Sequence, residues 1–417
     1  MSTKLFLKQL KNIESIVKHK EEALEEEYFE KYHAIFDEAQ RFLAKETILL
    51  YGGLAINELL PKKHQFYGDK ELPDFDMFST EGKSLATRAV HHFKQHGYPL
   101  ASSTEALHEN TYKVMVSGLP VLDITHVSKN MFEKLSIHKH KTKYGLYTVN
   151  PEYLRMTLHQ LLSQPKDAHR WIKLFKRVVS FYEVFPPDIQ SCKSLFEKPI
   201  STISTEQNEL LLKTFEWIRE NHYMVFSPDA WLSLLPKRNT VSKKIAQVVQ
   251  SIHFPTEIIV NDSKDLDSIA KHWFQFIQSK TKESGLKITP SRLSFSKIID
   301  NNFTPKHVYI YLDKKPIVGI YTINACVSYF ESDDNETNKL HIASVQTILR
   351  MYMQMILSEE SIVDINHVKC MVNLLTDLSV KSISRSKNEF LKSFILSCYG
   401  TQPGMATMKR ERYERGK

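Results

Sequence analysis

The feature that most restricts the fold is a short apolar run that ends in two adjacent glycines. Residues 48–51 read Ile-Leu-Leu-Tyr, Gly52 and Gly53 follow, and an apolar pattern with helical spacing resumes over 54–60. We expect a strand, a sharp break and a helix, because glycine tolerates backbone angles and close approaches that other residues do not. The free N–H groups and the positive dipole end at the start of such a helix favour an anion. The two glycines are therefore predicted to lie against a phosphate group.

Two aspartates follow about twenty residues later, in the segment 72–78. We interpret this segment as a strand, in which side chains two residues apart point to the same face. Asp74 and Asp76 then stand side by side, while Phe75 packs into the core. Two adjacent carboxylates repel each other unless a cation lies between them. The pair is predicted to bind Mg²⁺, which prefers carboxylate and phosphate oxygens.

A third carboxylate, Asp123, lies in the second of two strands expected at 111–118 and 120–127. Its neighbours are apolar, so a lone charge there would be costly unless it were coordinated or hydrogen-bonded. Two adjacent strands could bring Asp123 beside the first pair, and three carboxylates can hold two metal ions. In such a site one ion activates an attacking 3′-hydroxyl, and the other clamps a triphosphate and stabilises the leaving pyrophosphate.

In this order, Gly52-Gly53, Asp74-x-Asp76 and Asp123 resemble the signature of the polymerase β-like nucleotidyltransferase superfamily. Residues 151–177, PEYLRMTLHQLLSQPKDAHRWIKLFKR, resemble the poly(A) polymerase catalytic subunits of large nucleocytoplasmic DNA viruses, which include the poxvirus and mimivirus-like enzymes. Many relatives carry a hydroxyl residue directly after the glycines, where this chain has Leu54. One possible phosphate hydrogen bond is absent for that reason.

The resemblance implies a template-independent polynucleotide adenylyltransferase that adds AMP from ATP to RNA 3′ ends, as in viral mRNA polyadenylation. Asp74 and Asp76 would coordinate two Mg²⁺ or Mn²⁺ ions, and Asp123 would hold the ion that lowers the pKa of the hydroxyl. Gly52 and Gly53 would cradle the triphosphate of ATP.

The resemblance also implies partners and a location. The partners would be the RNA 3′ end and ATP, together with either a second copy of the chain or a separate viral processivity subunit, and no membrane. The location would be the virion and the host cytoplasm; without the viral resemblance, the expectation is only a soluble intracellular protein.

Basic residues on a helix expected over 167–183 are further candidates. Arg170, Lys173 and Arg177 fall at i, i+3 and i+7 and share one face, where they could grip phosphates. We take Arg170 and Lys173 as candidate nucleotide contacts. A solvated helix surface is the alternative.

A second basic stretch covers residues 134–143 and includes His138 and His140. Contact with an RNA backbone is one interpretation. We expect no metal role for these histidines, nor for His91 and His92.

The second half of the chain echoes the first. MVFSPDAWLSLLPK resembles ILLYGGLAINELLPK, with Ser227-Pro228 at the glycine pair, and TILRMYMQMIL resembles YLRMTLHQLL. The segment around the aspartate pair is echoed with Pro255 and Glu257, and KPIVGIYT echoes LPVLDITH with Gly319 where Asp123 stands. We infer a second nucleotidyltransferase-like fold without catalytic carboxylates. Chance similarity is the alternative.

The bulk properties fit a protein of two to three domains, with 417 residues and a net charge of +8 that favours a polyanionic partner. No secretory signal or membrane-spanning run is expected. The four cysteines, which lack zinc-ligand spacing, are expected to be reduced thiols; they are Cys192, Cys326, Cys370 and Cys398.

These patterns predict an α+β fold in which a polymerase β-like nucleotidyltransferase domain with helical additions precedes a degenerate copy. The expected organisation is an N-terminal helical segment (1–47), a catalytic nucleotidyltransferase domain (48–187), a linker (188–205), a degenerate nucleotidyltransferase-like domain (206–400) and a basic tail (401–417).

Two other functions stay open at this level. The first is a nucleotidyltransferase with a different acceptor, such as a tRNA end, an oligoadenylate, a small molecule or a protein, since one fold and metal site serve many acceptors. The second is a non-catalytic RNA-binding module.

Overall fold

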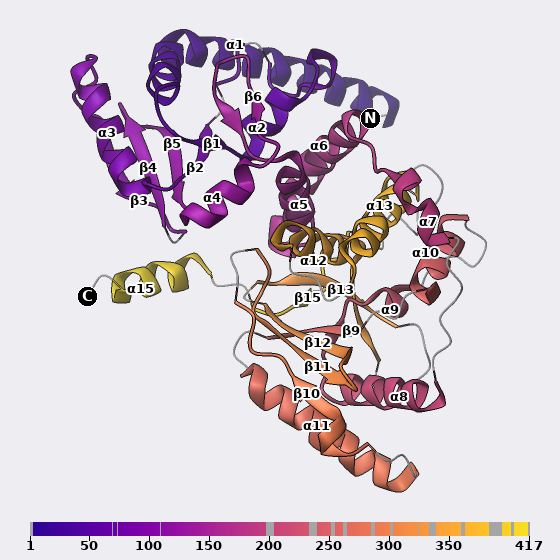
Figure 1. Cartoon of the computed structure of the whole chain (residues 1–417). Helices are drawn as coiled ribbons and strands as arrows, with labels where there is room; N and C mark the ends of the chain where they lie inside the picture. Colours follow the sequence, from indigo (N-terminus) through magenta and orange to yellow (C-terminus); the bar gives the residue numbers. More distant parts are fainter. Residues whose placement is uncertain are drawn as a thin grey trace. The chain divides into compact units, whose positions relative to one another are not determined.

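The computed structural model is an α+β fold with one mixed β-sheet in each of two units (Figure 1). Unit 1 comprises Met1–Leu154 and Met405–Lys417, and unit 2 comprises Arg155–Gly404. The structure describes residues 3–68, 70–72, 74–108, 110–196, 204–232, 240–251, 255–261, 265–284, 288–300, 303–323, 325–332, 339–359, 363–382, 394–401 and 404–415.

Sheet A, in unit 1, has the strand order β3-β4-β5-β2-β1-β7-β6. Its centre is mixed, because β2 runs parallel to β5 and antiparallel to β1, and β1 runs parallel to β7. The strands are β1 (Leu49–Leu50), β2 (Phe75–Ser79), β3 (Ser102–Glu105), β4 (Thr111–Val116), β5 (Leu119–His126), β6 (His140–Lys141) and β7 (Tyr147–Thr148).

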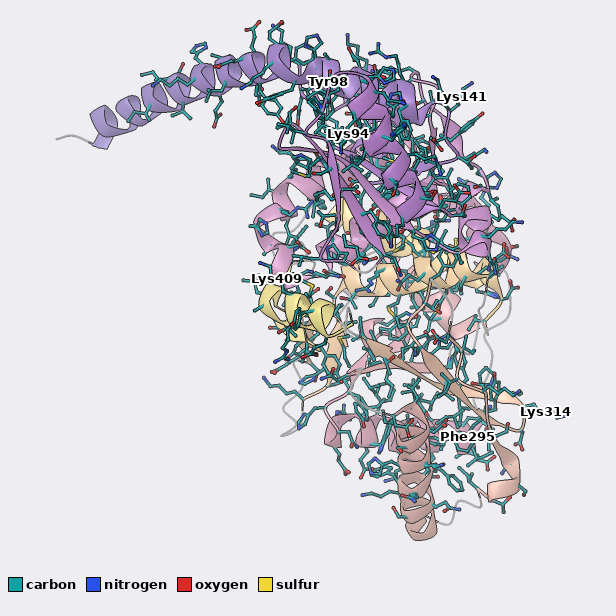
Figure 2. All side chains as sticks on the ribbon, turned by 90° about the vertical axis from the view of Figure 1, so that its left-hand side faces the viewer. Lys94, Tyr98, Lys141, Phe295, Lys314 and Lys409 are labelled. Atoms are coloured by element: carbon teal, nitrogen blue, oxygen red, sulfur yellow. A yellow bond between two sulfur atoms is a disulfide. The ribbon has the colours of Figure 1, made fainter. Side chains whose placement is uncertain are left out.

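The helices of unit 1 begin with α1, whose sequence contains neither glycine nor proline. The N-terminal half of α1 extends away from the rest of the unit (Figure 2), and the other half buries apolar residues at helical spacing. Among these, the ring of Phe36 lies 6.2 Å from that of Phe75, so Phe75 packs into the core as expected. The helices are α1 (Thr3–Leu43), α2 (Gly52–Leu59), η1 (Lys62–His64), α3 (Gly82–Gln95), α4 (Lys129–Ser136) and α15 (Met405–Arg415), and α5 (Pro151–Leu162) leads into unit 2.

Sheet B, in unit 2, has the strand order β10-β11-β12-β9-β8-β14-β13-β15. Its strands are more apolar than those of sheet A, and most residues of β9 and β12 are buried. The strands are β8 (Met224–Val225), β9 (Thr256–Asn261), β10 (Leu293–Phe295), β11 (His307–Leu312), β12 (Lys315–Ile323), β13 (Val327–Glu331), β14 (His341–Ala343) and β15 (Cys398–Tyr399).

The helices of unit 2 include two near-neighbours with buried tryptophans, Trp217 in α8 and Trp273 in α11. No helix among the described residues is long and apolar enough to cross a membrane. The helices are η2 (Pro165–Arg170), α6 (Trp171–Val184), η3 (Ile189–Cys192), α7 (Lys193–Phe196), α8 (Thr205–Glu220), α9 (Pro228–Leu232), α10 (Thr240–Ser251), α11 (Leu266–Ser284), η4 (Pro290–Arg292), α12 (Val345–Ser358) and α13 (Ile365–Ser382).

The two sheets share one topology. Reading from β3 and from β10, each strand of sheet A has a counterpart in sheet B at the same place in the order, and β15 is added at the end. The pairing senses agree as well, since β9 runs parallel to β12 and antiparallel to β8, as β2 does to β5 and β1. The echo seen in the sequence therefore corresponds to a repeated strand order.

The cysteines differ from expectation. Cys192 is bonded to Cys370, and Cys326 to Cys398, so the described chain has no free cysteine. The prediction of reduced thiols was wrong, because the partners are 178 and 72 residues apart and local spacing carries no sign of such contacts.

Candidate active site

The predicted aspartates lie at the centre of sheet A. In the parallel pairing of β2 with β5, Asp76 is the register partner of Asp123, and neighbouring strands lie only about 4.8 Å apart. Both side chains are half-buried, and Asp74 directly precedes β2 with an exposed side chain. Residues from two separate stretches of chain are thus brought to one place on the sheet.

Gly52 lies directly against this pair. The backbone N–H of Tyr51 donates to the carbonyl oxygen of Asp76 at 3.0 Å, which holds the end of β1 and the start of α2 beside β2. Gly52 has a φ of +72°, and a Cβ added there would overlap the Asp76 carboxylate. Only glycine fits this position without strain.

The first turn of α2 has no side-chain cap. Its N-cap residue is Tyr51, and no side chain caps the helix. The first N–H groups of a helix have no partner within the helix and attract negative charge. The glycine turn therefore presents backbone donors next to the carboxylates.

The side chain of Tyr51 ties the glycine turn to sheet A. Its hydroxyl lies 3.1 Å from that of Thr125 on β5, which is in turn 3.1 Å from the hydroxyl of Thr111 on β4. Burial raises the pKa of Tyr51, and the negative charge of Asp76 adds to the rise. The tyrosine stays protonated and links β1 to the neighbouring strands.

Lys113 is a member of the site that the sequence interpretation missed. It is the register partner of Asp123 across β4 and β5, and its Nζ lies 2.7 Å from the Asp123 carboxylate. Partial loss of hydration raises the pKa of Asp74, the charge of Asp123 raises it further, and Lys113 opposes the shift. The sequence signal for this contact was a lysine in the expected neighbouring strand, on the same face of the sheet as Asp123.

The carboxylates are adjacent but not tightly clustered. Among the described residues, the carboxylate oxygens of Asp74, Asp76 and Asp123 do not all lie within 4.8 Å of one another. Like charges repel, and the Lys113 ammonium offsets part of the charge of Asp123. The donor set consists of carboxylate oxygens beside a glycine cradle, and this chemistry suits Mg²⁺ or Mn²⁺ with a phosphate.

The predicted basic face on the helix of residues 167–183 is only partly present. Residues 165–170 form the 3-10 turn η2, so Arg170 ends that turn and α6 begins at Trp171. Arg170 and Lys173 are exposed, whereas Arg177 is buried. The expectation of an exposed stripe formed by all three was wrong at Arg177. Lys173 and Arg177 are four residues apart within α6, but tertiary packing covers the side chain of Arg177, which helical spacing alone does not predict. Both exposed residues belong to unit 2, and the aspartates belong to unit 1.

The basic stretch 134–143 forms the end of α4 and the β6–β7 hairpin. The Nζ atoms of Lys139 and Lys141 lie 4.4 and 6.0 Å from the ring centroid of Tyr147, and Lys141 points outward (Figure 2). The Tyr147 side chain keeps 37% of its surface exposed. Cations around an open aromatic ring are typical of surfaces that bind single-stranded nucleic acid.

The equivalent position in sheet B is closed. Glu257 on β9 pairs with Gly319 on β12 just as Asp76 pairs with Asp123, and the N–H of Phe226 donates to the Glu257 carbonyl as Tyr51 does to Asp76. The Glu257 carboxyl group is buried.

Three tyrosines fill the space around Glu257. The hydroxyls of Tyr352 and Tyr321 bond to the Glu257 carboxyl at 3.2 and 3.4 Å, and Tyr309 bonds to Tyr321. Burial raises the pKa of Glu257 to about 8. A Cβ on Gly319 would come within 2.9 Å of the Tyr309 ring, so the residue opposite Glu257 is a glycine that makes room for the ring.

The glycine turn, uncapped helix and paired aspartates on a mixed sheet agree with the nucleotidyltransferase site that the sequence resemblance implies. Residues 37–168 match the family described as Poly(A) polymerase catalytic subunit. Through this segment, about a third of its length, the chain is similar to the viral poly(A) polymerase catalytic subunits.

Individual relatives agree with this family. The chain is 23% identical over 416 residues to a protein of African swine fever virus assigned as a poly(A) polymerase catalytic subunit, and the match covers 87% of this chain and 85% of that protein. It is 24% identical over 330 residues to a protein of Acanthamoeba polyphaga mimivirus with the same assignment, which covers 72% of this chain and 52% of the relative.

A solved structure supports the fold over the whole chain. The crystal structure of the Megavirus polyadenylate synthase superposes with a TM-score of 0.72 at 17% sequence identity, and the match covers 100% of this chain and 85% of that one. At this identity the likeness concerns the fold.

Proposed function

We propose that this chain extends RNA 3′ ends with AMP from ATP, without a template, and so polyadenylates viral mRNA. The observation that carries the proposal is the register of Asp76 with Asp123 directly against Gly52. This arrangement offers a place for divalent cations and a place for a triphosphate side by side.

The aspartates would hold the metal ions. Asp74 and Asp76 would bind two Mg²⁺ or Mn²⁺ ions, and Asp123 would bind one of them, in exchange for its contact with Lys113. Bound ions would polarise the attacking hydroxyl and neutralise the charge of the triphosphate.

The chain's own groups position the substrates. The N–H groups at Gly52 and Gly53 would hold the triphosphate of ATP, and Lys113, when displaced from Asp123, would add positive charge near it. The 3′-oxygen of RNA attacks the α-phosphorus of ATP, the bond to the β-phosphate breaks, and pyrophosphate leaves. Arg170 and Lys173 stay candidate phosphate contacts.

Two features favour RNA as the acceptor. The net charge of +8 suits a polyanion. The β6–β7 hairpin adds lysines around the exposed ring of Tyr147, where an unstacked base could pack. A homodimer or a separate viral processivity subunit would complete the assembly, in the virion and the host cytoplasm.

Unit 2 would contain a degenerate copy of the nucleotidyltransferase fold. The repeated strand order supports a duplication, and Gly319 and buried Glu257 at the positions of Asp123 and Asp76 support the loss of catalysis in that copy. The domain organisation expected from the sequence is proposed on the same basis.

The test is primer extension with the purified chain, an RNA primer, each of the four NTPs separately, and Mg²⁺ or Mn²⁺. We expect tails with ATP, and their loss in Asp76→Ala with an unchanged circular dichroism spectrum. Tails made by Asp76→Ala at near wild-type rate would refute the metal-site assignment.

The same assay addresses other acceptors. Pyrophosphate release from ATP without primer extension, accompanied by labelling of a tRNA end, an oligoadenylate, a small molecule or a protein, would identify a different acceptor for the same site. Binding of RNA with no pyrophosphate release would identify a non-catalytic module.

A further inference from the structure

A second group of potential metal ligands lies in unit 1, where α1 meets α3. The Oε1 atom of Glu38 lies 2.6 Å from Nε2 of His92 and 3.8 Å from Nε2 of His96. Among the described residues, this is the set of three ligand atoms that all fall within 4.8 Å of one another. Lys94 and Tyr98, close to the two histidines in the sequence, mark this end of α3 in Figure 2.

The surrounding contacts orient these atoms, and the Nε2–H of His92 donates to Oε1 of Glu38, so a bound metal would displace that proton. The Nδ1–H of His96 donates to the carbonyl oxygen of His92 at 2.8 Å, which in the neutral ring makes Nε2 the nitrogen that can bind a metal. Both nitrogens of Arg41 that contact Glu38 donate to Oε2, so Oε1 faces the two imidazoles. A histidine that donates its other N–H to a carbonyl, and a hydrogen-bonded carboxylate, are usual outer contacts of a metal site.

Contrary to the expectation for His92 from the sequence, we propose that Glu38, His92 and His96 bind a zinc ion. Ligands of a tetrahedral zinc lie roughly 3.3 Å apart, given Zn–N and Zn–O bonds of about 2.1 Å, and the observed separations of 2.6 and 3.8 Å bracket that value. Two imidazole nitrogens and one carboxylate oxygen form a known zinc ligand set, with a water in the fourth position.

The donor set separates this site from the aspartates of sheet A. Imidazole nitrogen favours zinc and other late first-row metals, whereas Mg²⁺ prefers oxygen donors. Arg41 keeps 67% of its side chain exposed, so water screens its charge from the ion. The zinc site and the Mg²⁺ site therefore select different cations.

The ion would fasten α1 to α3. Glu38 lies two residues from Phe36, which packs on Phe75 between the two aspartates. His92 packs on Phe42 of α1, with ring centroids 5.0 Å apart. Zinc would thus stabilise the packing of the long helix against the strand that carries the catalytic residues.

The experiment titrates the full chain, stripped with a chelator, with Zn²⁺ in competition with a chromogenic chelator and in excess Mg²⁺. We expect one equivalent of zinc in the wild type. Affinity should fall on the order of 100-fold in His96→Ala, and zinc should raise the Tm of the wild type by several degrees but not that of the variant.

Two further variants make the result decisive. His91→Ala is the matched control, because His91 is exposed one residue away and contacts Gln95 instead of Glu38; it should bind zinc like the wild type. His92→Gln keeps a donor for Glu38 but removes the ligand nitrogen, and should lose zinc. Unchanged affinity in His96→Ala, or an equal loss in His91→Ala, would overturn the proposal.

Discussion

Sheets A and B share one topology, but the candidate site on sheet A is partly exposed to solvent, whereas the equivalent position on sheet B is buried. In sheet A, Asp76 and Asp123 are half-buried, and Lys113 is the charged partner beside them. In sheet B, Glu257 and Gly319 take those places, and tyrosines fill the space. The two sheets share a strand order although these side chains differ, because strand pairing depends on the backbone and on apolar side chains.

The contrast extends to electrostatics. The carboxylates of Asp76 and Asp123 in sheet A are half-buried and keep access to water. In sheet B burial favours the neutral form of Glu257, whose pKa rises to about 8. Asp76 is the proposed metal ligand, and its counterpart Glu257 is a buried hydrogen-bond partner of two tyrosines.

The sharpest test makes one chemical change at both equivalent positions. Asp76→Asn removes the charge that holds metal and should lower the rate of tail synthesis by at least about 1,000-fold. Glu257→Gln changes a group that is already neutral, and should leave the rate within about twofold. Single-turnover extension of a labelled RNA primer measures both. Equal losses in the two variants would end the distinction between an active and an inactive sheet.

The glycine turn gives the next largest expected effect. Gly52→Ala places a methyl group against the Asp76 carboxylate at a φ of +72°, so we expect tail synthesis to fall by about 100-fold, with a cost of about 1–2 kcal/mol in stability. At the equivalent position of sheet B the chain carries Ser227, which shows that the glycine is not a requirement of the topology.

Gly68→Ala is the control for this prediction. Gly68 has no positive φ, and a Cβ there meets nothing within 4 Å. In ATP titrations, Gly68→Ala should have the same kcat and KM as the wild type. Wild-type kinetics in Gly52→Ala would argue against a phosphate cradle at this turn.

The third prediction concerns stability against pH and leaves tail synthesis unchanged. The pKa of Glu257 is about 8 in the folded chain, against a usual value of 4.5, so its contribution to stability is complete below pH about 4.5 and is lost as pH rises through about 8. In that window the wild type should lose about 1.4 kcal/mol per pH unit from this group. Glu257→Gln should remove the slope.

Chemical denaturation of the full chain at several pH values, followed by tryptophan fluorescence, measures this slope. Trp217 and Trp273 report on unit 2, where both are buried. Glu331→Gln is the control, because Glu331 is exposed and pairs with Lys339 on the surface. The same slope in wild type and Glu257→Gln would mean that the buried carboxyl does not titrate in this range.

Much of the local structure could be predicted from the sequence. The apolar run, glycine pair and helix of residues 48–60 fold as β1 and α2, and the strand with Asp123 is β5. These patterns were readable because strands and helices alternate apolar residues at fixed periods. The roles of Asp74, Asp76 and Asp123 in catalysis remain predictions, as does the metal they would bind.

Contacts between distant residues were not readable in the same way. The Cys192–Cys370 bond was missed, and Arg177 was expected on an exposed stripe but is buried. Each depends on packing between residues far apart in the chain, which local patterns do not signal.

The sequence by itself determined which chemical groups this protein has and in what order, namely glycines, three aspartates, and a second set in which they are replaced. Only the tertiary structure decided which groups meet: Asp76 with Asp123, Lys113 with Asp123, Tyr321 with Glu257, and Glu38 with His92. The physical reason is that local periodicity fixes the direction of each side chain, whereas strand register and helix packing fix its neighbours.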